Sequence, residues 1–168
     1  HFEEESKMKK TPTLVSERLV LRPFAEGDGP SIYKWCSSSK VTQFLFWYPH
    51  KDEMVSERLL KVWLRKKRHY SWGITLGNDL FGEVEVIKDI QDNECEIGYT
   101  LREDMWGKGY AKEALRKVIC FLFVSEGYKS IYAETDARNE RSGFLLSSLG
   151  FHKTGENVPF YVSKKDEH

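Results

Sequence analysis

The sequence predicts an α/β fold around one mixed sheet, and three observations support this prediction. Apolar and polar residues alternate between residues 70 and 101, which indicates strands, whereas an amphipathic pattern at 109–123 indicates a helix that a further strand follows. The 168 residues fit one ordinary domain, and 10 Phe, 8 Tyr and 5 Trp can fill its core. We therefore expect a single domain over residues 14–168, preceded by a flexible or expression-derived extension at residues 1–13.

The N-terminal third is expected to contain one strand and two helices. Residues 14–23 have leucines at alternate positions, which indicates a strand, and Asp28 is placed to cap a helix after it. The aromatic segment 44–50 contains a proline and is expected to be irregular. Asp52 then opens a second helix, whose apolar face is expected to carry Val55, Leu59, Val62 and Trp63.

Three antiparallel strands are expected next, at residues 70–76, 80–87 and 94–101. The first two are joined by Gly-Asn-Asp at 77–79, which is typical of a hairpin turn, and a polar turn at 89–93 leads to the third.

A helix and a strand that follow complete a crossover connection. The helix at 109–123 is expected to end near Gly127, and the next strand spans 129–136. With the strand before it, this helix predicts a right-handed parallel connection, where a ligand is expected. The remaining elements are a short helix at 142–149 and a last strand at 151–162.

Composition and charge exclude several classes of protein. The 26 basic and 26 acidic side chains balance to a formal net charge of zero, so the overall positive charge of many nucleic-acid-binding proteins is missing. No apolar run approaches the length of a membrane span, and residues 1–10 lack the apolar core of a signal peptide. Cys36, Cys95 and Cys120 have no metal-ligand spacing, so we expect free thiols, no metal and a cytoplasmic protein.

Residues 106–111, Trp-Gly-Lys-Gly-Tyr-Ala, connect the third of these strands to the amphipathic helix. Glycines there let successive backbone N–H groups point outward at a helix N-terminus, whose partial positive charge favours a phosphate. A tight turn without a ligand explains the same residues equally well. The chain lacks the GxxxxGK[ST] of a P-loop, and Lys112 replaces the third glycine of a dinucleotide-binding GxGxxG.

Several motifs in order along the chain resemble the GCN5-related N-acetyltransferase (GNAT) superfamily. In its acetyl-CoA signature, Gln/Arg-x-x-Gly-x-Gly/Ala, Gly109 and Ala111 match, and Trp106 stands at the Gln/Arg position. Its later Asn-x-x-Ser/Ala element with a distant Gly-Phe is matched by Asn139, Ser142, Gly150 and Phe151. Segments 16–23, 96–99 and 106–115 further resemble the branch that acetylates ribosomal-protein N-termini and its small-substrate relatives.

The resemblance implies a mostly antiparallel central sheet with helices on both faces and acetyl-CoA at the parallel crossover. The amides of 107–111 would hold the pyrophosphate, and pantetheine would pair with the strand backbone at 99–101. Lys108, Lys112 and Arg141 could meet CoA phosphates, although solvated charges explain them equally well. The cofactor-binding residues are thus expected to be Tyr99, Thr100, Leu101, Trp106, Gly107, Lys108, Gly109, Tyr110, Ala111, Asn139 and Ser142.

The implied reaction is direct attack of a neutral amine on a thioester, without a covalent enzyme intermediate. The amine must lose a proton, a backbone N–H near Tyr99 or Thr100 must stabilise the carbonyl oxygen, and the thiolate must be protonated or stabilised. Glu96 is the first choice of base, because its strand is the one closest to the expected thioester. The other candidates are Glu83, Glu85 and Glu94, and each of the four could instead be a solvated strand residue.

The acid is less evident from the sequence. Many family members carry a tyrosine seven residues after the Asn, where this chain has Leu146. Ser142 is therefore the candidate acid, although its hydroxyl could instead cap the short helix.

The acceptor amine is expected to enter against the segment 44–50, which includes His50, and against Trp72. The expected partners are acetyl-CoA and this amine, with no nucleic acid or membrane, for a monomer or homodimer. A non-catalytic acyl-CoA-binding or regulatory domain remains the alternative. The sequence does not select among a ribosomal-protein N-terminus, a polyamine, an aminoglycoside and an amino acid as acceptor.

Overall fold

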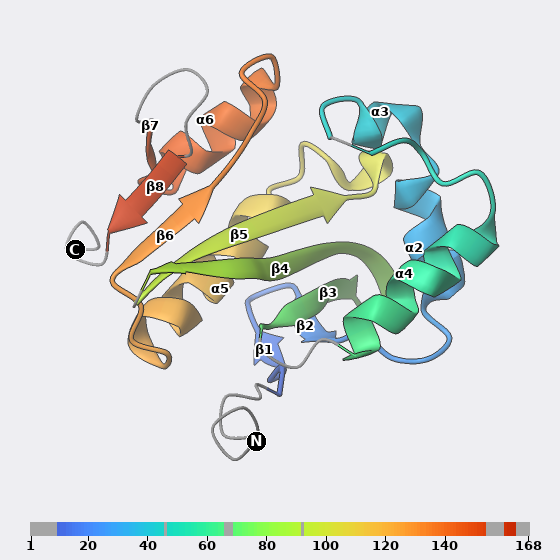
Figure 1. The fold of residues 1–168 in the computed structure, drawn as a ribbon, viewed down its shortest axis with the longest axis horizontal. Helices are drawn as coiled ribbons and strands as arrows, with labels where there is room; N and C mark the ends of the chain where they lie inside the picture. The colour runs from blue at the N-terminus through green and yellow to red at the C-terminus, as the bar shows by residue number, and fades with distance from the viewer. Residues whose placement is uncertain (1–9, 46, 66–68, 92, 154–159, 164–168) are drawn as a thin grey trace.

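The computed structural model describes residues 10–45, 47–65, 69–91, 93–153 and 160–163. Figure 1 shows the elements, which are β1 (Leu14–Val15), β2 (Val20–Pro23), α2 (Gly29–Cys36), α3 (Ser39–Thr42), α4 (Glu53–Arg65), β3 (Ser71–Leu76), β4 (Asp79–Gln91), β5 (Glu94–Leu101), the short helix η1 (Glu103–Met105), α5 (Tyr110–Val124), β6 (Ser130–Ala133), α6 (Glu140–Ser148), β7 (His152–Lys153) and β8 (Phe160–Ser163).

The strands form one sheet in the order β1-β2-β3-β4-β5-β6-β8-β7. Within the described residues, β5 and β6 are parallel and the other neighbouring pairs are antiparallel. α5 connects the two parallel strands across one face of the sheet (Figure 1). The predicted mixed sheet with a parallel crossover is confirmed.

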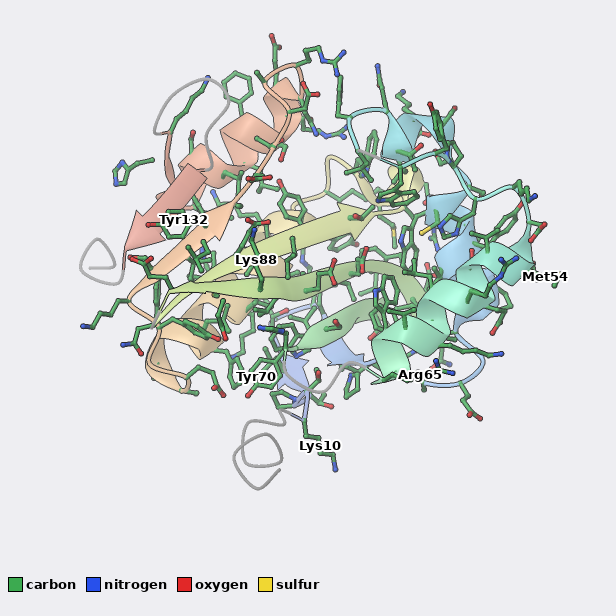
Figure 2. All side chains as sticks on the ribbon, viewed as in Figure 1. Lys10, Met54, Arg65, Tyr70, Lys88 and Tyr132 are labelled. Atoms are coloured by element: carbon green, nitrogen blue, oxygen red, sulfur yellow. The ribbon has the colours of Figure 1, made fainter. Side chains whose placement is uncertain are left out.

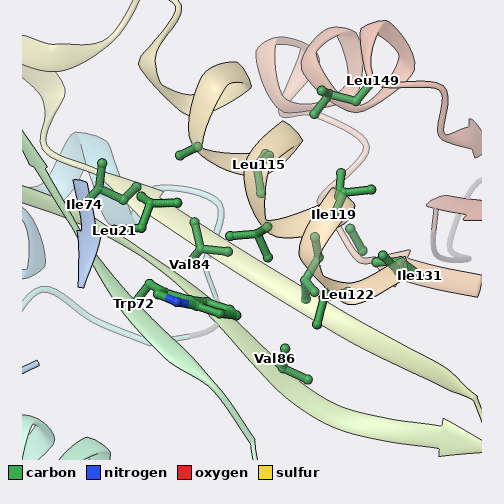
Figure 3. Close-up of a cluster of buried hydrophobic side chains, with 14 of the residues drawn as sticks. Leu21, Trp72, Ile74, Val84, Val86, Leu115, Ile119, Leu122, Ile131 and Leu149 are labelled. Carbon is green, nitrogen blue, oxygen red and sulfur yellow. The ribbon is translucent and has the colours of Figure 1, made fainter. Parts of the chain in front are cut away.

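Helices cover both faces of the sheet and enclose two cores. Figure 3 shows the larger one, in which Leu115, Ile119 and Leu122 of α5 pack against strand residues that include Trp72 and Val84. On the opposite face, α2 and α4 contribute the second core, which contains Phe24, Ile32, Trp35, Cys36, Leu60, Trp63 and Leu80. α6 joins the larger core through Leu146, and its C-cap residue Leu149 also belongs to this core.

The two predicted helix caps have different outcomes. Asp52 accepts hydrogen bonds from the amides of Met54 and Val55 at 2.9 and 3.3 Å, so its prediction is confirmed. Asp28 precedes α2 but its side chain makes no cap bond. Its carboxylate instead accepts from the Arg22 guanidinium at 2.9 and 3.0 Å, and from the Ala25 amide at 2.8 Å. Asp28 is therefore the N-cap residue of α2 as predicted, but the side-chain cap bond is missing because the salt bridge to β2 occupies the carboxylate oxygens.

The apolar face predicted for α4 is partly wrong. Leu60 and Trp63 are buried, whereas Val62 is 60% exposed. The helix packs on α2 through Ser56, Leu60 and Trp63, so Trp63 is buried as predicted, while Ser56 and Leu60 are buried in place of Val55 and Leu59.

The first and last predicted strands are each divided in two. Residues 14–23 form the antiparallel pair β1 and β2, because the Ser16 amide donates to the Leu19 carbonyl and closes a turn at 3.0 Å. The strand expected at 151–162 is the antiparallel pair β7 and β8, and 154–159 lie outside the described residues.

The described part of the N-terminal extension lies against the sheet. The Ser71 amide donates to Thr11 Oγ1 at 3.2 Å, and Trp72 Nε1 donates to the Pro12 carbonyl at 2.8 Å. Among the helices that the structure describes, none has both the length and the apolar character to cross a membrane.

Candidate active site

The site is built where β5 and β6 separate. Their parallel ladder pairs Glu94 with Ser130, Cys95 with Ile131 and Glu96 with Tyr132. β5 continues to Leu101, still paired with β4, while β6 ends at Ala133 and diverges from it (Figure 1). The far half of β5 is therefore a strand edge that β6 does not cover.

The antiparallel ladder with β4 decides which peptide groups face this edge. The Arg102 amide donates to the Phe81 carbonyl at 2.8 Å, so peptide groups at every second residue before Arg102 also point toward β4. Because of this alternation, the backbone N–H and C=O of Thr100 point toward β4, whereas those of Tyr99 and Leu101 point toward the open edge. The Leu101 carbonyl is already bonded to Trp106 Nε1 at 2.9 Å. Of the backbone groups at 99–101 that were predicted to pair with a ligand, those of Tyr99 and the amide of Leu101 are available at the open edge.

The glycine loop has the backbone that its sequence predicts. Gly107 and Gly109 have φ of +73° and +82°, a left-handed conformation that residues with a Cβ rarely adopt. Gly109 is the N-cap of α5, so Tyr110 and Ala111 begin the helix with amides that lack intrahelical acceptors. Such amides at a helix N-terminus are suited to bind an anion.

Two residues that the sequence analysis missed fix this loop to β1 and β2. Glu113 accepts from Ser16 Oγ at 2.6 Å, from the Arg18 amide at 2.8 Å and from Arg18 Nε at 2.7 Å. Arg18 also donates to the Lys108 carbonyl at 3.2 Å and lies 4.6 Å from the Tyr110 ring centroid. No sequence pattern signals this pairing, because the partners are 95 residues apart.

The pKa of Glu113 reflects these contacts. Partial burial raises it, but the hydrogen bonds from Ser16 and Arg18 and the charge of Arg18 outweigh burial, so the pKa lies below its ordinary value. The carboxylate is therefore ionised at neutral pH and tied to the guanidinium.

Asn139 and Ser142 open α6 on the other side of the strand separation. Asn139 Oδ1 accepts from the Ser142 amide at 3.2 Å, so Asn139 is the cap of this helix. The reading of Ser142 as the cap is wrong, since its hydroxyl lies 2.5 Å from the Tyr99 hydroxyl across the gap between the elements. Burial raises the pKa of the Tyr99 phenol, whereas the bond to Ser142 and the charge of Arg141 lower it less.

A second contact links α6 to the β5 side. The Arg141 guanidinium lies 3.4 Å from the centroid of the Trp106 ring, a cation–π contact. Burial lowers the pKa of Arg141, with Tyr99 and Glu103 opposing this effect. Arg141 therefore stacks on the aromatic residue that replaces the family's Gln/Arg, at the edge of the glycine loop.

Glu96 lies on the face of the sheet opposite α5. Its neighbours Cys95 and Ile97 belong to the core with α5, so alternation places Glu96 on the other side. Figure 2 labels Lys88 and Tyr132, which lie on the strands on either side of β5. The Glu96 side chain is 10% exposed, and its Oε1 lies 4.0 Å from Lys88 Nζ. Burial and the charge of Glu134 raise its pKa, and Lys88 lowers it less.

The other carboxylates of the predicted set differ in burial. Glu83 is buried at 7% exposure, while Glu85 and Glu94 are half-buried. Glu83 and Glu85 lie on the same face as Glu96, because they pair with Thr100 and Gly98 of β5.

The predicted acceptor surface is partly wrong. Trp72 is fully buried in the core with α5 and packs 5.8 Å from Phe121, because its position on β3 faces α5, so it cannot contact an acceptor. The segment 44–50 is irregular where described. Its His50 bonds Ser56 Oγ through Nδ1 at 2.8 Å, and burial lowers the pKa of this imidazole. The guanidinium carbon of Arg138, in the loop before α6, lies 5.5 Å from the ring centroid of Phe44.

No group of three or more His, Cys, Asp or Glu residues is arranged for a metal in the parts of the chain that the structure describes. The three cysteines are free thiols, with Cys36 and Cys95 buried and Cys120 exposed.

A sequence model described as "Acetyltransferase (GNAT) domain" matches residues 18–152 of the chain. The chain belongs to the GNAT acetyltransferase family. An uncharacterized N-acetyltransferase of Bacillus licheniformis is 30% identical to this GNAT chain over 152 residues, which cover 85% of this chain and 84% of the relative. The ribosomal protein uS5-alanine N-acetyltransferase of Escherichia coli is 38% identical over 61 residues, 36% of this chain and 31% of that protein.

Solved structures show the same GNAT fold. A GNAT-family acetyltransferase of Bacillus anthracis has a TM-score of 0.81 at 20% identity, with 94% of this chain and 100% of that chain covered. The spermidine N-acetyltransferase of Vibrio cholerae, in complex with CoA and spermine, has a TM-score of 0.76 at 19% identity, with 89% and 97% covered. The predicted family, fold and enzyme class are confirmed, and this chain is an N-acetyltransferase.

Proposed function

We propose that this N-acetyltransferase moves the acetyl group of acetyl-CoA onto a primary amine by direct attack within a ternary complex. The observation that carries the proposal is the separation of β5 and β6 after Glu96, beside the helix start at Gly109. An extended donor can pair with the open strand edge while its phosphates meet the helix N-terminus. The Vibrio cholerae structure with CoA and spermine supports this, because its fold is the same.

Residues on both sides of the strand separation would hold the donor. The pyrophosphate would bind the amides of the loop that ends at Ala111, with no Cβ to obstruct it at Gly107 or Gly109. The Leu101 amide would pair with pantetheine, and the free amide hydrogens of the Asn139 side chain would bind the same arm. Lys108, Lys112 and Arg141 would lie near the phosphates.

The amine would be deprotonated by Glu96. A carboxyl group whose pKa is raised is the stronger base once ionised, and Glu96 is such a group. Deprotonating an α-amine at pH 7 costs about 1 kcal/mol, whereas a lysine-like amine costs between about 4 and 5 kcal/mol. The base therefore matters most for an alkyl amine.

The tetrahedral intermediate would be stabilised by groups other than the base, at its oxyanion and at its sulfur. The Tyr99 amide faces the open edge of β5 and would donate to the oxyanion. When the carbon–sulfur bond breaks, the Ser142 hydroxyl would donate a hydrogen bond to the thiolate, since Leu146 lies in the core at 0% exposure.

Calorimetric titration of the Gly109→Glu variant with acetyl-CoA tests the donor site. We expect no measurable binding, because the new carboxylate would lie where the pyrophosphate binds and would repel it. Gly127→Glu is the matched control, since its φ of +75° imposes the same backbone strain at the far end of α5. Binding by the control alone supports the site, and unchanged affinity of Gly109→Glu contradicts it.

A further inference from the structure

We propose that Tyr99 orients the hydroxyl of Ser142, so that the serine proton points at the sulfur of the departing thiolate. The inference rests on the proposed acetyl transfer. Its basis is the 2.5 Å contact between the two hydroxyl oxygens, which joins β5 to α6 beyond the last β5–β6 ladder pair. A serine with one hydrogen and free rotation needs a fixed partner before it can direct that hydrogen anywhere.

The protein holds both partners of this contact in place. Asn139 Oδ1 binds the Ser142 amide at 3.2 Å and fixes the first turn of α6. Arg141 stacks on Trp106, whose indole donates to the Leu101 carbonyl two residues after Tyr99. The backbone segments that carry the two hydroxyls are therefore linked to one another by these contacts, which keeps Tyr99 and Ser142 within hydrogen-bond reach.

Acid strength decides which hydroxyl donates. A phenol is more acidic than an alkyl alcohol, so the Tyr99 hydroxyl is the better donor and Ser142 Oγ the better acceptor. Burial keeps the phenol neutral by raising its pKa, and the nearby charge of Arg141 strengthens it as a donor. Once Oγ accepts from Tyr99, the serine retains its own hydrogen for a third atom.

The third atom is the sulfur. As the carbon–sulfur bond breaks, its electron pair moves to sulfur, and the Ser142 hydroxyl donates a hydrogen bond to the forming thiolate. The Tyr99 hydrogen bond offsets the negative charge that this donation places on Oγ. The amine proton goes to the base, the thiolate takes a proton from water, and neither hydroxyl loses its proton overall.

This arrangement explains how a chain with leucine at the family's tyrosine position retains a phenol in the site. Leu146 points from α6 into the core, while Tyr99 reaches the first turn of the same helix from β5. Tyr99 is thus a positioning residue that acts through Ser142.

Kinetics of Tyr99→Phe, Ser142→Ala and the double variant test the proposal. We expect Tyr99→Phe to lower kcat about tenfold, with the KM for acetyl-CoA changed less than about twofold, because only a transition-state hydrogen bond is weakened. Ser142→Ala should lower kcat by about 10². The double variant should match Ser142→Ala, since Tyr99 acts only through the serine. In the wild type, kcat should fall at high pH, where the Tyr99 phenol ionises and no longer donates a hydrogen bond. This fall should be absent from the pH profile of Tyr99→Phe.

Tyr128→Phe is the matched control. The native Tyr128 hydroxyl donates a 2.7 Å hydrogen bond to Asp89, and this bond lies outside the region where β5 and β6 separate. The control variant should change thermal stability without changing kcat. Full kcat in Tyr99→Phe, or losses that multiply in the double variant, would overturn the positioning role while the wild type still transfers acetyl groups. A wild type that binds acetyl-CoA without amine-dependent thiol release would contradict the proposed function itself, and the inference with it.

Discussion

Glu96, the proposed base, owes its properties to its place in the fold. It occupies the last residue of β5 that pairs with β6, and the pleat turns it away from α5. Burial in that position is what raises its pKa, with a contribution from Glu134. Because a base acts only when deprotonated, the reaction rate is expected to increase with pH through a value above the ordinary pKa of a glutamate.

Replacing Glu96 by glutamine should lower turnover by about 10² to 10⁴ near neutral pH and remove the acid limb of the pH profile. Acetyl-CoA affinity should stay close to that of the wild type, which calorimetry can verify. Rates should be compared for an α-amine and a lysine-like amine, and the loss should be larger for the latter because its deprotonation is harder.

Glu85→Gln is the companion measurement, since Glu85 lies on the same face of the neighbouring strand. If Glu96→Gln retains full turnover at pH 7 and Glu85→Gln loses it, the base has been assigned to the wrong carboxylate.

At the level of elements, the start of α5 depends on residues from outside the crossover. The glycines give the loop its shape, and the Arg18–Glu113 pair attaches the first turn of α5 to the β1–β2 hairpin. In α6, the position where many family members have a tyrosine is occupied by Leu146, whose side chain packs in the larger core.

Glu113→Gln should weaken acetyl-CoA binding and lower the thermal midpoint. The pKa of Glu113 is depressed in the folded state, so its stabilising contribution is complete above the unfolded-state pKa and is lost as the pH falls through the lower folded-state value. The midpoints of variant and wild type should therefore differ at neutral pH and converge in acid. Glu140→Gln, an exposed residue in the first turn of α6, is the control. Equal midpoints at neutral pH would show that the pair does not hold the loop.

Leu146→Tyr should not restore a general acid. The site is fully buried in the larger core, and the added atoms should lower the free energy of unfolding by about 1–3 kcal/mol without raising turnover. Phe144→Tyr on the exposed side of the same helix, where the native side chain is 74% exposed, should change neither quantity. A stable Leu146→Tyr variant with faster turnover would contradict the assignment of thiolate stabilisation to Ser142 and Tyr99. Denaturant unfolding and steady-state rates check both points.

For the whole molecule, periodicity and turn residues predicted the three-strand meander, α5 and the parallel crossover, because these signals are local. They did not predict α3, and β4 extends to Gln91, into the turn expected at 89–93. The same signals failed where one side chain had two competing partners, as at Asp28, or where a neighbouring helix selected the buried stripe, as at Val62 of α4. Motif and strand position predicted the positive φ values of the glycine loop and the placement of Glu96 on β5, whereas the roles of both in the reaction stay predictions.

The contacts between distant residues could not be found in this way. Tyr99 with Ser142 and Arg18 with Glu113 are 43 and 95 residues apart, and each becomes visible only when the strands are in register. Trp72 was misplaced because an aromatic residue on a strand fits either face until the pairing is known.

The central claim, direct transfer from acetyl-CoA to an amine, is tested most directly by thiol release from the wild type. The rate should be measured over a matrix of acetyl-CoA and amine concentrations, with mass spectrometry of the acetylated amine. Direct attack in a ternary complex predicts amine-dependent release and reciprocal plots that intersect. Parallel lines would indicate a covalent acetyl-enzyme, and acetyl-CoA binding without release for any amine would indicate a non-catalytic acyl-CoA-binding domain; either result would contradict the account.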